Sequence, residues 1–206
     1  MGNYKNILSY ALVIGLAVCF SSRAMAQQVG FGFYTNSELT LTPNILPAVL
    51  DFGYVISGQG NKPISITDEE TVVLEIVGVA YLDVTVTLIP PTPSFLLLEG
   101  NTDYLNDTSR RMPVDIKMAY YNQGQPNIDI VTAKQQAITV TGNTATFQIR
   151  RRPGGPPGPP PVPPHANYTP PTATAYLFIF GELTVGNVNA GPYTGDIIVE
   201  VEYSTY

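Results

Sequence analysis

The sequence offers few side chains that could carry out chemistry. It contains one histidine, His165, and one cysteine, Cys19. A serine hydrolase triad or a histidine-based metal site would have to use His165, which lies in the proline-rich stretch 163–167. A lone histidine in such a loop is more often solvated than catalytic. Because the inventory of acids and bases is so small, we expect no enzymatic activity.

Two groups of acidic residues could in principle bind calcium. One is the run Asp68-Glu69-Glu70, and the other is the pair Asp103 and Asp107. Neither has the fixed ligand spacing of an EF-hand loop. Solvated turns explain both groups, so we predict no metal site and no cofactor.

The charge balance argues against nucleic acid, and we expect no nucleic-acid partner. The 206 residues include 10 basic and 16 acidic side chains, which gives a formal net charge of −6. A protein that binds the phosphate backbone needs a basic patch or stripe. The short basic runs Arg110-Arg111 and Arg150 to Arg152 are read as local charges on an acidic chain.

The first 26 residues have the features of an export signal. Lys5 precedes an apolar run from Ile7 to Phe20, and Ala24-Met25-Ala26 then places small residues where a signal peptidase cleaves. We predict cleavage before Gln27. The apolar run is shorter than the roughly 20 residues that a membrane span requires. After cleavage we therefore expect no membrane span and a secreted protein, extracellular or at the cell surface.

Lipidation is an alternative fate for the same segment. Leu16-Ala17-Val18-Cys19 resembles a lipoprotein box, but Val18 is bulky where that signal needs a small residue. If Cys19 leaves with the signal, the mature chain has no cysteine. Loss of Lys5 and Arg23 leaves eight basic residues against 16 acidic ones, a net charge of −8.

Apolar and polar residues alternate with a period of two along much of the remaining chain. This pattern is typical of half-buried antiparallel strands, because successive side chains point to opposite faces. It is found in three segments, with the inward residues Leu82, Val84, Val86 and Leu88; Val114, Ile116, Met118 and Tyr120; and Ile197, Val199, Val201 and Tyr203.

Other segments complete an all-β prediction. Val72–Val79 and Tyr176–Phe180 are apolar on both faces, as expected of central or covered strands. Thr141 to Thr144 has the Gly-Asn chemistry of a tight hairpin. No window keeps a helical period with caps. About eight to ten strands separated by Gly, Pro and Asn turns indicate an antiparallel β-sandwich, with a barrel as the alternative.

One segment cannot belong to a sheet. Residues 150–171 read RRRPGGPPGPPPVPPHANYTPP, and prolines at this density cannot donate to a hydrogen-bond ladder. We expect a stiff polyproline II loop inserted between two strands. It is either a tolerated surface insertion or a contact element that reaches a neighbour or a ligand.

The start of the mature chain is a candidate donor strand. Val29, Phe31 and Phe33 lie on one face of an extended segment, and Gly30 and Gly32 lie on the other. The apolar face suits a ready-made groove, and the bare face lets another backbone approach closely. The alternation does not say whose sheet the strand joins, so an ordinary first strand of its own sheet stays open. The segment 38–42, with Leu39 and Leu41, is a second and more conventional strand candidate.

The end of the chain carries a closing-strand motif. After the segment 181–185, the motif contains Gly191, Tyr193, Gly195, Ile197, Val199, Val201 and Tyr203. Together with Leu50-Asp51-Phe52-Gly53, this stretch resembles a bacterial family of secreted pilin-like domains of unknown function, related to spore coat protein U and to chaperone-usher fimbrial subunits. The resemblance covers residues 46–206 and excludes the proline-rich insert.

The resemblance implies an immunoglobulin-like sandwich that is exported for assembly into surface fibres. In chaperone-usher subunits the sheet is one strand short, and the N-terminal extension of the next subunit fills the gap. A periplasmic chaperone and an outer-membrane usher are the partners implied. Gly191 and Tyr203 match the spacing of the family's closing strand. The chain differs from the family by continuing through Tyr206 and by having no mature cysteine.

The sequence thus predicts three parts: a signal peptide at 1–26, an N-terminal extension at 27–45 and a pilin-like domain at 46–206. Our first hypothesis is a structural subunit of an extracellular fibre or pilus. Identical subunits would join head to tail by donor-strand complementation through Val29, Phe31 and Phe33, in the service of adhesion or biofilm formation. The alternative is a monomeric secreted module that binds a surface.

Overall fold

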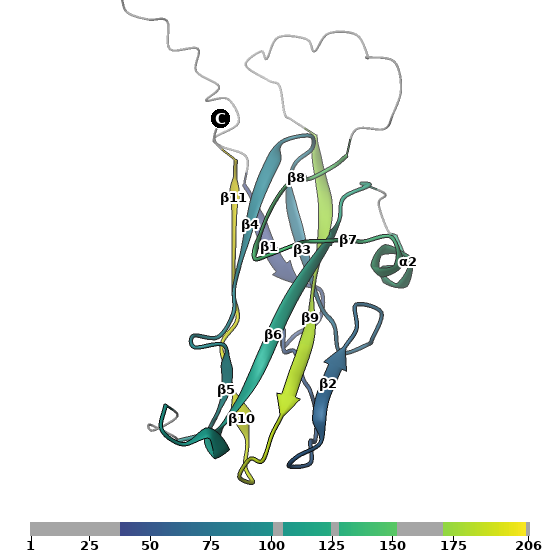
Figure 1. The fold of residues 1–206 in the computed structure, drawn as a ribbon. Coiled ribbons are helices and arrows are strands. Elements are labelled where there is room, and N and C mark those ends of the chain that lie inside the picture. Colours follow the sequence, from purple (N-terminus) through teal and green to yellow (C-terminus); the bar gives the residue numbers. More distant parts are fainter. Residues whose placement is uncertain (1–37, 101–104, 125–127, 152–170, 205–206) are drawn as a thin grey trace, which may run out of the picture. The chain divides into compact units, whose positions relative to one another are not determined.

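The longest strand, β9 (Thr172–Val185), organises the larger of two sheets (Figure 1). One edge of β9 pairs with β6 (Arg111–Tyr121). Its other edge pairs with β3 (Val72–Val79) and then with β2 (Gly60–Ile64). All of these pairs are antiparallel. The computed structural model describes residues 38–100, 105–124, 128–151 and 171–204.

Short strands extend the larger sheet on both sides. β1 (Thr40–Pro43) pairs with β3 and lies at one edge. On the other side, β5 (Phe95–Leu98) pairs with β6, and β10 (Tyr193–Thr194) pairs with β5. β7 (Ile138–Thr139) adds two residues to the far end of β6.

The smaller sheet contains three strands in the order β11–β4–β8. They are β11 (Ile198–Tyr203), β4 (Asp83–Ile89) and β8 (Thr144–Gln148), and both pairs are antiparallel. The two sheets form a sandwich, which confirms the all-β prediction.

The hydrophobic core lies between the sheets, on the faces that the period-two pattern predicts. In β4, Val84, Val86 and Leu88 are at most 1% exposed, and the residues between them are half-buried. The same alternation is present in β6 from Met112 to Met118. Leu177 and Ile179 of β9 complete the centre of the core.

A second, smaller cluster covers the outer face of the larger sheet. Phe178 of β9 and Tyr121 of β6 are buried there beside Ala133 of the short helix α2 (Ile130–Gln135). This cover explains why the segment 176–180 is apolar on both faces. No window of the sequence has a helical period with caps, and this short helix was not predicted. Its six residues are too few to show a period, although Asp129 caps it by accepting a hydrogen bond from the N–H of Val131.

The predicted hairpin at 141–144 is wrong. β7, before it, pairs with β6 of the larger sheet, whereas β8, after it, pairs with β4 of the smaller sheet. The bend, in which Gly142 has a φ of 85°, therefore carries the chain from one sheet to the other. Turn chemistry specifies a local reversal, but it does not determine which strands pair.

Part of the predicted N-terminal extension belongs to the sheet. Residues 40–43 pair with Leu74 to Val77 of β3 in the same chain, so Leu41 lies in the conventional strand considered above and Leu39 directly precedes it. Only residues before this strand remain candidates for donation. The donor residues Val29, Phe31 and Phe33 lie outside the described residues, as does most of the proline-rich insertion, 152–170.

Candidate functional site

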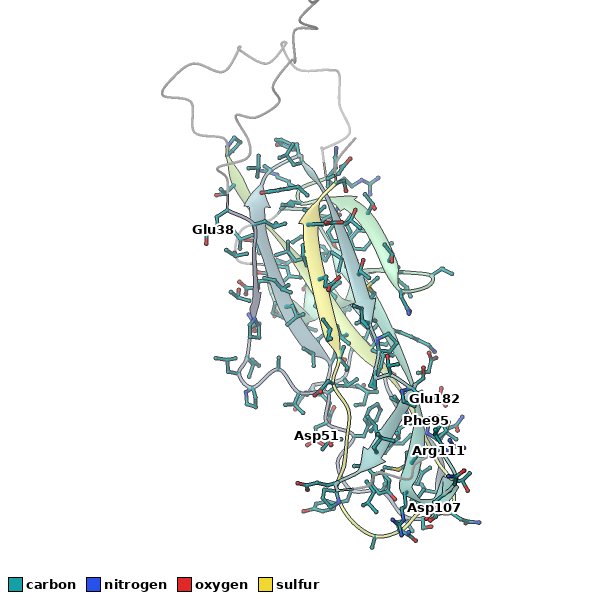
Figure 2. The ribbon with its side chains drawn as sticks, turned by 90° about the vertical axis from the view of Figure 1, so that its left-hand side faces the viewer. Glu38, Asp51, Phe95, Asp107, Arg111 and Glu182 are labelled. Carbon is teal, nitrogen blue, oxygen red and sulfur yellow. The ribbon has the colours of Figure 1, made fainter. Side chains whose placement is uncertain are left out.

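The two sheets end side by side in strands that each have a single partner. β1 is the last strand of the larger sheet and pairs only with β3, and β11 is the last strand of the smaller sheet and pairs only with β4, within the residues described. Figure 2 faces this side of the molecule, which we call the open side. An unpaired strand edge is a template for another strand.

The two edges converge over Gly78, on the inner face of β3. A Cβ atom at Gly78 would lie 2.6 Å from the Tyr203 hydroxyl of β11 and 2.9 Å from Cδ1 of Leu39, just before β1. The backbone N–H of Val79 donates a hydrogen bond of 2.9 Å to the same hydroxyl. Because Gly78 has no side chain, residues from both sheets meet at this point.

The inward-facing apolar side chains along the open side are only half-buried. Val199, Val201 and Tyr203 point toward the core from β11, but each is partly exposed, unlike their neighbours in β4. On the facing edge, Leu39 and Leu41 are also only partly buried. Each sheet therefore presents apolar side chains and main-chain groups that one further strand could cover.

A pocket of about 880 Å³ lies at the end of the sandwich where β9 finishes. Its walls are the segment 49–55 and the segment 188–195, and its floor includes Leu96, Met112 and Leu183. We call this the end pocket. Asp51 is the single charged residue that lines it, among the described parts of the chain.

The segment 45–56 beside the end pocket is unusually apolar for a surface. Five of the nine exposed large hydrophobic residues in the described ranges belong to it, namely Ile45, Leu46, Val49, Tyr54 and Ile56. Tyr54 is fully exposed. Exposed apolar residues gathered in one segment are candidates for an interaction site.

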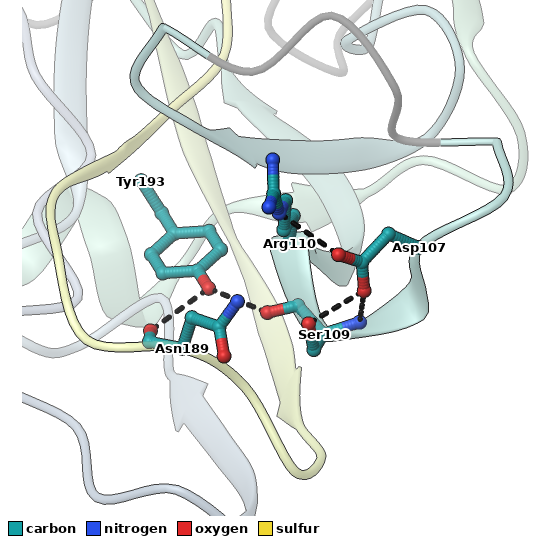
Figure 3. A network of polar contacts seen from close by, with 5 residues as sticks. All are labelled: Asp107, Ser109, Arg110, Asn189 and Tyr193. Carbon is teal, nitrogen blue, oxygen red and sulfur yellow. Dashed lines mark hydrogen bonds and ion pairs between the residues drawn. The ribbon is translucent and has the colours of Figure 1, made fainter.

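Tyr193 fixes the second wall of the end pocket (Figure 3). Its hydroxyl lies 2.9 Å from the carbonyl oxygen of Ser109 and 3.0 Å from that of Asn189, and it donates to these two acceptors. The backbone N–H of Asn189 also donates to the Ser109 carbonyl. Burial raises the pKa of Tyr193, so the hydroxyl stays protonated and keeps its donor role.

Asp107 supports this network from the other side of the 3₁₀ turn η1 (Thr108–Arg110). Its carboxylate accepts hydrogen bonds from the hydroxyl and the N–H of Ser109 and pairs with Arg110 at 2.8 Å. The hydroxyl of Ser109, followed by its N–H and the Arg110 guanidinium, lowers the pKa of Asp107. Ser109 is thus held where its carbonyl meets Tyr193.

Two glycines of the closing-strand motif allow close packing on β5. Gly191 has a φ of 147°, and a Cβ there would lie 2.5 Å from Cδ1 of Leu98. A Cβ at Gly195 would lie 3.0 Å from Cδ2 of Leu96 and 3.1 Å from Pro91. Glycine at these positions lets the chain pair with β5 and then pass into β11.

The structure divides the closing-strand motif between the end pocket and the core. Gly191, Tyr193 and Gly195 border the end pocket, and Val199, Val201 and Tyr203 face the core from β11. Ile197 lies between the two groups and is half-buried. The stretch Leu50-Asp51-Phe52-Gly53 was singled out for the resemblance, but it did not predict that the segment 49–55 forms the opposite wall of a pocket. The apolar content of this segment was a signal, but it lacks the alternation that identified the strands.

Other chemistry finds little support in the described ranges. No cluster of three or more His, Cys, Asp or Glu side chains with metal-binding geometry is found there. Asp68 already has partners within the protein, because its carboxylate accepts the N–H of Ser65 and its carbonyl accepts a hydrogen bond from the buried Lys134. His165 and Asp103 lie outside the described residues. No described helix is both long enough and apolar enough to cross a membrane.

Comparison with known proteins adds no relative. No protein-family model matches the chain, and no curated protein sequence matches it.

Proposed function

We propose that the protein is a structural subunit of an extracellular fibre, in which residues 27–34 of one copy add a strand between β1 and β11 of the next. The observation that carries this proposal is the open side, where both sheets end next to each other with their inward apolar residues half-exposed. The resemblance to secreted pilin-like domains supports the same assembly.

The candidate donor matches the open side in pattern. Val29, Phe31 and Phe33 recur every second residue, as do Val199, Val201 and Tyr203 of β11. A strand between the two edges would place its apolar face over the core, and Gly30 and Gly32 would face outward. Burial of its three apolar side chains would contribute on the order of 5 to 8 kcal/mol before ordering costs.

The topology also favours one direction for the donated strand. β1 begins at the end of the sandwich where β3 passes into β4, so the preceding residues leave from that end, where Glu38 lies in Figure 2. The end pocket lies at the opposite end. A head-to-tail contact joins these two ends, so the donor enters beside the pocket and runs antiparallel to β11. Such a contact does not close and therefore yields a filament.

Deletion of residues 27–34 tests the proposal. The full mature chain should form heat-resistant, high-molecular-weight species and filaments visible by electron microscopy, and the deletion should abolish both. Phe31→Asp should have the same effect, because a buried unpaired charge costs several kcal/mol, whereas the matched Phe31→Leu should still assemble. Fibres that survive the deletion would refute the proposal. A mature protein that is monomeric with Phe31 covered by its own sheets would favour the surface-binding module instead.

A further inference from the structure

The donated strand proposed above would not extend over the end pocket. The apolar part of the donor, Val29 to Phe33, spans five residues, or about 17 Å at 3.4 Å per residue. That length is close to the length of β11, which has six residues. The end pocket lies beyond the start of β11, beside β10 and the segment 188–195. Its volume of about 880 Å³ falls in the range of sites that bury a sizeable ligand.

The chemistry of the end pocket suits a proline-rich chain. The half-buried Tyr193 and the fully exposed Tyr54 border it together with Pro192 and aliphatic side chains, and Phe52, which also lines it, belongs to the buried core. Aromatic-lined grooves bind polyproline II segments, because these are already extended and lose little conformational entropy on binding. The single charge in the lining is the acidic Asp51, and the proline-rich segment of this chain follows Arg151 and Arg152. The segment 153–164 is itself uncharged, and the two arginines that precede it are opposite in charge to Asp51.

The proline-rich segment of the same copy cannot reach the end pocket. Its two flanks are held at the opposite end of the sandwich, where the N–H of Ala80 donates to the carbonyl of Pro171 and the N–H of Arg151 donates to that of Asn122. From Thr172 to Leu183, at the pocket, β9 rises by about 36 Å at 3.3 Å per residue. The segment 152–170 is fixed at both ends, so about half of its residues are needed for the return. The other half would span roughly 31 Å in polyproline II, which is less than the distance along β9.

We propose that the end pocket binds the proline-rich segment 153–164 of a second copy of this chain. In the fibre proposed above, the end that carries this segment abuts the end that carries the pocket, so each junction would contain a donated strand and a docked proline-rich segment. The inference rests on the proposed function for this placement. The docking itself depends only on the residues of the pocket and the segment.

Cysteine cross-linking between two copies tests the docking. A chain that begins at residue 27 has no cysteine, so single substitutions give unambiguous pairs. Two full mature chains with different tags would both carry Phe31→Asp, which removes strand donation. One would also carry Val49→Cys, an exposed position in the pocket lining, and the other Val162→Cys. The control replaces Val49→Cys with Val131→Cys, an equally exposed valine on α2, away from the pocket.

Docking should raise the yield of the mixed disulfide roughly tenfold over the control pair, because it raises the effective concentration of the two thiols. A yield equal to that of the control would overturn the proposal. A second arm adds an excess of a peptide of residues 27–36. A yield that persists supports separate sites, whereas suppression shows that the donated strand itself fills the pocket and overturns the proposal. A separate observation tests the proposed function: fibres that persist in the Phe31→Asp chain would refute it without bearing on the docking.

Discussion

The hydroxyl of Tyr203 accepts a hydrogen bond of 2.9 Å from the backbone N–H of Val79, a residue 124 positions earlier in the chain. The two residues belong to different sheets, because Tyr203 ends β11 and Val79 ends β3. This bond joins the edge strand of the smaller sheet to the larger sheet at one end of the open side. It therefore holds the end of β11 against β3, the strand that pairs with β1.

Loss of this hydroxyl should weaken the sandwich. In Tyr203→Phe, the N–H of the buried Val79 loses its acceptor, which should cost about 1 to 3 kcal/mol of unfolding free energy. Urea unfolding of the monomeric Phe31→Asp chain, with and without Tyr203→Phe, measures the difference. Tyr54→Phe is the matched control, because its fully exposed side chain should change stability by less than about 0.5 kcal/mol. Equal effects of the two substitutions would show that the bond contributes nothing.

A side chain at Gly78 should force the two edges apart. In Gly78→Ala, the new Cβ would meet Cδ1 of Ile149 at 2.5 Å as well as Tyr203 and Leu39. These contacts are the far ends of side chains, which can shift, so we expect a loss of about 1 to 3 kcal/mol rather than unfolding. Thermal and urea unfolding measure it.

Gly186 provides the control for this substitution. It is exposed, and a Cβ there would have no neighbour within 4 Å. Gly186→Ala should therefore change stability by no more than about 0.5 kcal/mol. If Gly78→Ala is as mild as Gly186→Ala, the convergence of the two sheets over Gly78 is looser than the structure indicates.

The strands could be predicted from the sequence because a strand that is buried on one face has apolar and polar residues in alternation. Apolar and polar residues alternate in the segment 82–88, and every second residue of β4 is buried. The segment 72–79 is apolar on both faces, and β3 has the same bounds. The residue pattern of a strand does not show which other strand it pairs with. The bend at Gly142 looks like a hairpin in sequence, but it carries the chain between sheets.

The candidate site was predictable only in part, for a related reason. Val199, Val201 and Tyr203 alternate, so β11 could be identified, but the pattern does not show that β11 is an edge strand with half-exposed inward residues. The end pocket depends on the segment 49–55, which has no regular period. Its contact with the segment 188–195 is a tertiary relationship that no local signal specifies.

The contribution of Asp107 to stability should depend on pH. Ser109 and Arg110 lower the pKa of this carboxyl from its ordinary value of 3.8. A lowered pKa means that the carboxylate stabilises the folded state above pH 3.8, and that this stabilisation is lost as the pH falls through the folded-state pKa. Asp107→Asn should therefore reduce stability at neutral pH, and its difference from the parent chain should shrink under acid conditions. Urea unfolding of both chains at neutral pH and below pH 3.8 measures the difference in unfolding free energy. A difference that is the same at both pH values would contradict the prediction.

A peptide of residues 27–36 should stabilise the Phe31→Asp chain by occupying its open side. A ligand that binds only the folded state adds RT ln(1 + [L]/Kd), or about 2.7 kcal/mol at 100 times the Kd. For a domain of this size, that gain corresponds to a rise in Tm of roughly 5 to 11 °C. The same peptide carrying Phe31→Asp and Phe33→Asp should give no rise, because a charged side chain would be buried without a partner over the core. Adding Val201→Asp to the chain should also remove the rise, since Val201 faces the core at the centre of β11. A chain whose Tm responds equally to both peptides would show that binding does not use the apolar face of the strand.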